Sequence, residues 1–89
     1  MNISKALIID DEPDIRELLT ITLENLGLKV SQASTAREAL DMIENGKFDL
    51  CLTDMRLPDG NGLQILDAIQ QKQSQMPVAV ITAHGNTEM

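Results

Sequence analysis

Short apolar runs alternate with longer amphipathic segments along the whole chain. Four segments have the length and the apolar or alternating character of β-strands, and glycine, proline or acidic residues bound them. Between them, apolar residues recur every three or four positions, which is the spacing of one helical face. The pattern predicts strands at 6–9, 28–31, 48–53 and 78–82, and helices at 13–26, 36–45 and 62–72.

The predicted helices carry recognisable end signals. Pro13 suits the first turn of the first helix and Gly27 ends it, while Thr35 and Glu38 form a capping-box signature at the start of the second. The spacing then predicts which residues face the core. These are Ile15, Leu18, Leu19, Thr22, Leu23 and Leu26 in the first helix, Ala36, Ala39, Leu40 and Ile43 in the second, and Leu63, Ile65, Leu66 and Ile69 in the third.

Strict alternation of strands and helices predicts an α/β domain. Such an order implies right-handed crossovers and a parallel sheet with helices on both faces. At 89 residues the chain is at most one small domain, covering 1–89, and Phe48 is its only aromatic residue. The residues after the fourth strand read as a loop and the beginning of a further helix. The expected order is therefore β-α-β-α-β-α-β.

Acidic residues follow two of the predicted strands. Asp10 and Asp11 come directly after the first strand, and Asp54 directly after the third. Carboxyl ends of parallel strands share one edge of a sheet, which is where open α/β sheets bind ligands. Carboxylates crowded there either raise a pKa or bind a hard cation such as Mg²⁺. Taken alone, Asp10 and Asp11 could serve only to cap the first helix, but Asp54 and Thr82 at the same edge favour a binding site.

Composition narrows the range of partners. A formal net charge of −7 opposes nonspecific binding to nucleic acid or anionic lipid. A single cysteine, Cys51, rules out an internal disulfide and is expected to be a buried thiol. No signal peptide is recognisable, and no apolar run approaches the roughly 18 residues that cross a bilayer. We therefore expect a cytoplasmic protein without direct membrane or nucleic-acid contacts.

Three segments together resemble the receiver domains of bacterial two-component response regulators. They are Leu7-Ile8-Ile9-Asp10-Asp11-Glu12-Pro13, then Asp54-Met55-Arg56-Leu57-Pro58-Asp59-Gly60, and then Val80-Ile81-Thr82-Ala83. The stretches 52–58 and 81–85 are most similar to the branch whose receivers control sigma-54-dependent transcription activators. The resemblance implies a flavodoxin-like (CheY-like) doubly wound parallel sheet with neighbouring first and third strands. Signalling by conformational switching, rather than enzymatic turnover, is the implied activity.

The resemblance also assigns roles to individual residues. Asp54 would be the phosphoacceptor that takes a phosphoryl group from a sensor histidine kinase. Asp11, Asp54 and the main-chain carbonyl of Arg56 would bind Mg²⁺, with Asp10 as an auxiliary group. Thr82 would donate its hydroxyl to the phosphoryl group and Ala83 would flank the pocket. The effector domains of a longer regulator would lie outside this chain.

The chain departs from the family pattern after the fourth strand. The last helix, strand and helix of a receiver are missing, including a strand-end lysine that pairs with the phosphoryl group, and neither Lys5 nor Lys72 can be carried onto that role. The strand at 78–82 would then be an exposed edge through which the chain could self-associate. A non-phosphorylated interaction or dimerisation module is therefore the main alternative. A phosphoaspartyl hydrolase would need a nucleophile-x-Asp pattern, whereas Asp10 and Asp11 are adjacent.

Overall fold

Four parallel strands form the central sheet, in the order β2-β1-β3-β6. The computed structural model describes residues 4–72 and 75–81. Along the chain the elements are β1 (Lys5–Ile9), α1 (Pro13–Asn25), β2 (Lys29–Ala33), α2 (Ala36–Asn45), β3 (Leu50–Asp54), β4 (Arg56–Leu57), β5 (Gly60–Asn61), α3 (Gly62–Lys72) and β6 (Val78–Ile81). The predicted α/β class and the adjacency of the first and third strands are confirmed.

The register of the sheet aligns the carboxyl ends of its strands. Ile9, the last residue of β1, pairs with Ala33 of β2 on one side and Thr53 of β3 on the other. Asp54 pairs with Ile81 of β6. The central strand β1 is covered on both faces, which explains why its four residues after Lys5 are all apolar and buried.

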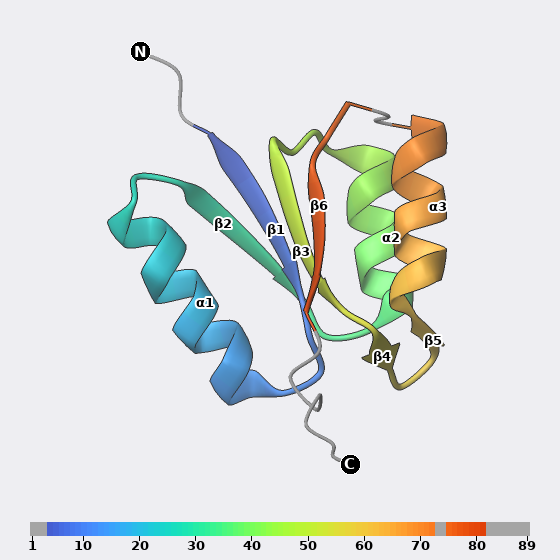
Figure 1. Ribbon diagram of the computed structural model, residues 1–89, viewed down its shortest axis with the longest axis horizontal. Helices are drawn as coiled ribbons and strands as arrows, with labels where there is room; N and C mark the ends of the chain where they lie inside the picture. Colours follow the sequence, from blue (N-terminus) through green and yellow to red (C-terminus); the bar gives the residue numbers. More distant parts are fainter. Residues whose placement is uncertain (1–3, 73–74, 82–89) are drawn as a thin grey trace.

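Helices cover both faces of the sheet, α1 on one side and α2 with α3 on the other (Figure 1). The α2–α3 side holds the larger core, which includes Leu7, Ile9, Ile43, Ile65 and Ile69. The α1 side buries Ala6, Ile8 and Leu23, with further leucines and Val30 packed against them at partial exposure. None of the helices in the described part of the chain is long and apolar enough to cross a membrane.

Several local predictions are confirmed. Gly27, two residues after the last residue of α1, adopts a φ of 93°, a left-handed conformation that suits glycine. Thr35 Oγ1 accepts a hydrogen bond from the N–H of Glu38 at 3.1 Å, as the capping box requires. The Glu38 carboxylate, however, accepts from the N–H of Ser34 at 2.8 Å, one residue before the expected partner. Cys51 is buried, and burial raises the pKa of its thiol to about 12.

Three leucines that the spacing placed in the core are exposed. Leu18 is 64% exposed, Leu26 is 71% exposed and Leu63 is 59% exposed. Leu26 lies beyond the last residue of α1. Leu18 and Leu63 lie about 140° and 160° around their helices from the buried Leu23 and Ile65, at roughly 100° per residue. The inward faces are thus narrower than the sequence pattern suggested.

The segment 57–60, predicted as a turn, is the tip of a short hairpin. Strands β4 and β5 are antiparallel, with Arg56 opposite Asn61 and Leu57 opposite Gly60. Pro58 and Asp59 make the turn between them, which agrees with their turn propensity. Two-residue strands are too short for the sequence pattern to reveal. The hairpin leads directly into α3.

Candidate functional site

The three carboxylates predicted to share an edge come together. One carboxylate oxygen from each of Asp10, Asp11 and Asp54 lies within 4.8 Å of the others. Asp10 is fully buried and Asp54 is 1% exposed, whereas Asp11 is exposed. The proximity follows from the aligned ends of β1 and β3. Two buried acids and one exposed acid thus form an acidic pocket at the carboxyl edge of the sheet, a name we keep for these three residues.

Asp10 is held on two sides by backbone groups. Its N–H donates to the Ala33 carbonyl at 3.0 Å, and its Oδ1 accepts from the Glu12 N–H at 2.9 Å. Its Oδ2 is buried and has no hydrogen-bond partner within the described residues. A buried carboxylate oxygen without a partner is costly. A cation bound between the acids would compensate it.

The protonation of Asp10 reflects this environment. Burial raises the pKa of Asp10, and the neighbouring charges of Asp54, Asp11 and Glu12 raise it further. The hydrogen bond from the Glu12 N–H acts in the opposite direction and lowers it. The net effect is a raised pKa, so that without a cation the pocket resists full ionisation.

Asp54 closes β3 at the point where α3 approaches the strand. The N–H of Arg56 lies 3.5 Å from Asp54 Oδ1, and the N–H of Gly62 donates to the Met55 carbonyl at 2.8 Å. A Cβ at position 62 would lie 3.0 Å from the Asp54 carbonyl oxygen and 3.3 Å from the Met55 Cα. Glycine therefore suits this close backbone approach, because any larger residue would require the end of β3 to shift by a few tenths of an ångström.

Arg16 is a second anchor of the acidic pocket, which sequence reasoning did not find. Its Nη1 donates to the Asp10 carbonyl at 2.6 Å and its Nε donates to Gln32 Oε1 at 3.2 Å. The side chain thereby links α1 both to the residue that follows β1 and to β2. An arginine six residues after Asp10 is a weak signal in a sequence, because its partners are a main-chain group and a distant glutamine.

Asp59 fixes the hairpin that follows Asp54. Its Oδ1 accepts from the Ala36 N–H at 2.7 Å and its Oδ2 accepts from the Arg37 N–H at 3.0 Å. The carboxylate thus caps the amino end of α2 from another part of the chain. The Ala36 hydrogen bond is the main cause that lowers the pKa of Asp59. Sequence reasoning saw only a turn residue here.

The remaining predicted residues fall in three groups. Arg56 begins β4, directly beside the acidic pocket, and the role of its carbonyl stays a prediction. Thr82 and Ala83 lie outside the described residues. Lys5 and Lys72 start β1 and end α3, at the amino-terminal edge of the sheet, which agrees with the expectation that neither faces the acids.

The strand order and the helices on both faces define a CheY-like α/β domain, the fold of solved structures that this chain resembles. The chain belongs to the response regulator receiver domain family, whose family model matches residues 6–89. Members of this family are modules of two-component signalling. The receiver resemblance drawn from the three sequence segments is thereby confirmed.

One curated relative is the response regulator protein PilR of Pseudomonas aeruginosa. It is 54% identical over 88 residues, which cover 99% of this chain. The chain spans 20% of the length of PilR, so most of that protein has no counterpart here. The similarity therefore concerns the receiver portion.

Solved receiver structures share the fold over nearly the whole chain. A receiver domain protein from Methanospirillum hungatei aligns with a TM-score of 0.89 at 33% identity, covering 99% of this chain and 69% of that chain. The response regulator TrrA of Thermotoga maritima, in complex with Mg²⁺ and BeF, aligns with a TM-score of 0.79 at 30% identity, covering 98% and 77%. TrrA in complex with the histidine kinase ThkA gives a TM-score of 0.84 at 31% identity, covering 98% and 75%.

Proposed function

We propose that this chain is a partial receiver domain, spanning 1–89, that accepts a phosphoryl group on Asp54 from a phosphohistidine of a sensor histidine kinase. The observation that carries the proposal is the convergence of three carboxylates within 4.8 Å at the carboxyl edge of the sheet. A carboxylate oxygen of Asp54 would form the new bond to phosphorus while the phosphorus–nitrogen bond of the donor breaks. The bonding electron pair stays on the departing imidazole nitrogen.

The oxygen donors of the acidic pocket fit Mg²⁺. Asp11, Asp54 and the main-chain carbonyl of Arg56 would hold the ion, and Asp10 would support it, because hard cations prefer carboxylate and carbonyl oxygens. The feature of this structure that favours a bound cation is the buried Oδ2 of Asp10, which has no hydrogen-bond partner among residues 4–72 and 75–81. Bound Mg²⁺ would neutralise charge on the transferred phosphoryl group. The structure of the related TrrA in complex with Mg²⁺ and BeF also supports this proposal.

The chain's own residues would position and protect the reacting carboxylate. Gly62 allows α3 to pack against the end of β3, and Arg16 holds the residue that follows β1. Burial of Asp54 at 1% exposure limits access of water to the acyl phosphate. From the family resemblance, Thr82 would bind the phosphoryl group and Ala83 would flank it. The output would pass to effector domains of a longer transcription regulator.

Intact mass spectrometry tests this proposal directly. After incubation with Mg²⁺ and acetyl phosphate, we expect the mass of a single phosphoryl adduct, and we expect none when EDTA removes the Mg²⁺. The reason is that an unshielded pocket of three acids repels the anionic donor. Absence of an adduct under both conditions would instead favour the non-phosphorylated interaction module.

A second candidate role is self-association through β6. In the described part of the chain this strand pairs only with β3, and its Val80 is 37% exposed. An apolar edge strand is a template for pairing with another chain. We expect light scattering of the chain to show a mass above that of a monomer. The carbonyls of Pro77 and Ile81 accept from β3, so the alternation of a parallel ladder directs the N–H of Val80 to the free edge. A Val80→Pro variant, which removes that outward N–H, should shift the mass toward the monomer. A monodisperse wild-type monomer would contradict this role.

A further inference from the structure

All four lysines of the chain lie at the amino-terminal edge of the sheet, opposite the acidic pocket. Lys5 and Lys29 begin β1 and β2, Lys47 lies just before β3, and Lys72 ends α3. The three arginines occupy other parts of the structure. In a chain with a net charge of −7, this edge is where its basic side chains are concentrated. We call these four residues the lysine edge.

Lysines of this edge line several hollows, two of which meet at Phe48. One, of about 270 Å³, is lined by Lys5, Lys29, Lys47 and Phe48 together with Val30, Ser31 and Gly46. The other, of about 410 Å³, is lined by the same Lys47 and Phe48 and by Lys72, Met76 and Pro77. Phe48, the only aromatic residue, is thus shared by both hollows. The larger hollow falls in the range of roughly 300 to 1,000 Å³ that is typical of binding pockets.

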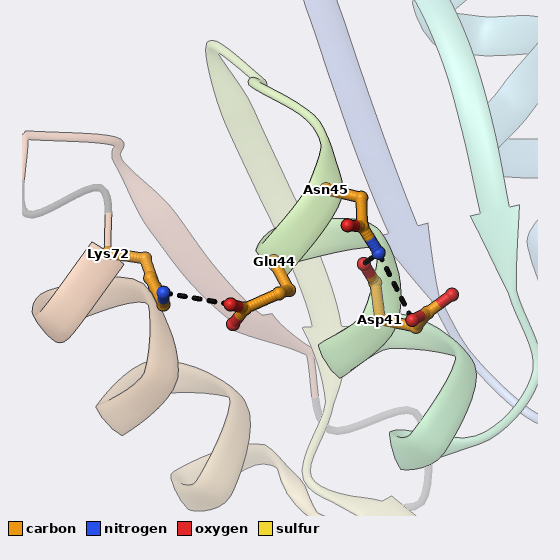
Figure 2. A network of polar contacts seen from close by, with 4 residues as sticks. All are labelled: Asp41, Glu44, Asn45 and Lys72. Atoms are coloured by element: carbon orange, nitrogen blue, oxygen red, sulfur yellow. Dashed lines mark hydrogen bonds and ion pairs between the residues drawn. The ribbon is translucent and has the colours of Figure 1, made fainter.

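The charges of the lysine edge are only partly balanced. Lys72 Nζ donates to Glu44 Oε2 at 2.9 Å across the ends of α3 and α2 (Figure 2). In residues 4–72 and 75–81 this is the one ion pair that a lysine makes. Asp49, whose Oδ2 accepts from the main-chain N–H of Lys5 at 2.8 Å, also lines the larger hollow and offsets part of the lysine charge. Three ammonium groups therefore have no ion pair within the described chain.

Fold stability accounts for only one of these lysines. Lys72 lies in the last turn of α3, where a positive charge is favoured by the helix dipole. Lys5 and Lys29, by contrast, are register partners on adjacent strands, and like charges directly opposite each other destabilise a sheet. Their placement around a hollow that Lys47 and Phe48 also line is better explained by a ligand that carries negative charge.

We propose that the lysine edge is a docking surface for an acidic segment of a partner protein, with an apolar side chain of that segment seated against Phe48 and Met76. The lysines would surround this contact as a charged rim, which steers association and fixes register. A protein segment fits better than nucleic acid or a membrane, because a net charge of −7 repels extended polyanions, whereas a short segment meets this edge alone. The side chains of Phe48 and Met76 would also make no favourable contact with a phosphate backbone.

The test is an NMR titration of the full chain with a short synthetic peptide of glutamates around a central leucine. We expect shifts at the amides of Lys47 and Phe48 and weaker binding at higher salt. The variant Lys47→Glu should weaken binding by about tenfold, because attraction becomes repulsion. Arg37→Glu is the control with the same change in charge, away from the lysine edge, and should bind within about twofold of the wild type.

Several results would overturn the proposal. One is that the control variant weakens binding as much as the lysine variant, which would mean that only net charge matters. Another is that a peptide with serine in place of the leucine binds equally well, since no apolar contact would then be involved. Tighter binding of a DNA oligonucleotide or of anionic vesicles would assign the surface to another class of partner. If the amides of Lys47 and Phe48 shifted with the concentration of the chain alone, without peptide, the lysine edge would instead bind a second copy of the chain.

Discussion

Replacing Asp54 by alanine is expected to abolish the phosphoryl adduct in the presence of Mg²⁺ and acetyl phosphate. Asp54 is buried at the end of β3 and supplies the oxygen that would form the bond to phosphorus. Asp10 is oriented by the Glu12 N–H toward a supporting role, so it should not substitute for the lost nucleophile. The measurement is intact mass, followed by proteolytic mapping of the adduct in the wild type.

A matched control removes an acid of the same type elsewhere. Asp67 is exposed on α3 and accepts a hydrogen bond from Gln71 on the same helix at 3.3 Å. The Asp67→Ala variant should therefore carry the adduct to the wild-type extent. An adduct that persists in Asp54→Ala, or one that maps to another residue, would disprove the assignment of the acceptor.

Replacing Asp10 by asparagine is expected to stabilise the protein without Mg²⁺ and to remove most of its stabilisation by Mg²⁺. The change keeps an acceptor for the Glu12 N–H but removes one of three crowded charges. We expect a gain of about 1 kcal/mol in the free energy of unfolding, in the range typical of relieving a buried group that lacks a partner. In the wild type, Mg²⁺ at a hundred times its Kd would add about 2.7 kcal/mol, and the variant should gain much less.

The pH dependence of the same variant gives an independent check. The pKa of Asp10 is raised in the folded protein above its ordinary value of 3.8. Between the ordinary pKa and the raised pKa of the folded protein, the folded state binds more protons than the unfolded state. Stability without Mg²⁺ therefore falls as the pH rises through that window. Asp10→Asn should lack this loss in thermal unfolding scans. An unchanged pH profile in the variant would show that Asp10 is not the titrating group.

The sequence pattern could locate the acidic pocket because the pocket depends on strand ends. An apolar strand closed by an acid places that acid at the carboxyl edge, and parallel pairing of β1 with β3 brings Asp10, Asp11 and Asp54 together. That inference needs only local composition and the order of the elements. It can be made without knowing the path of any loop.

The anchors around the pocket could not be predicted in the same way. Asp59 binds the start of α2, 22 and 23 residues away along the chain, and Arg16 binds a main-chain carbonyl and Gln32. Such contacts are fixed by three-dimensional proximity rather than by spacing. The burial of α1 was misjudged for a related reason, because periodicity gives the direction of a helical face but not the width of the surface that covers it.

The two hydrogen bonds that Asp59 accepts limit the directions in which a signal could leave the acidic pocket. Both oxygens of Asp59 hold the hairpin after Asp54 on the amino end of α2, and Gly62 continues that hairpin into α3. Movement of this hairpin would have to break the hydrogen bonds by which Asp59 caps α2. Rearrangement after modification of Asp54 should therefore be directed toward β6, on the side of β3 where no such cap holds the described residues.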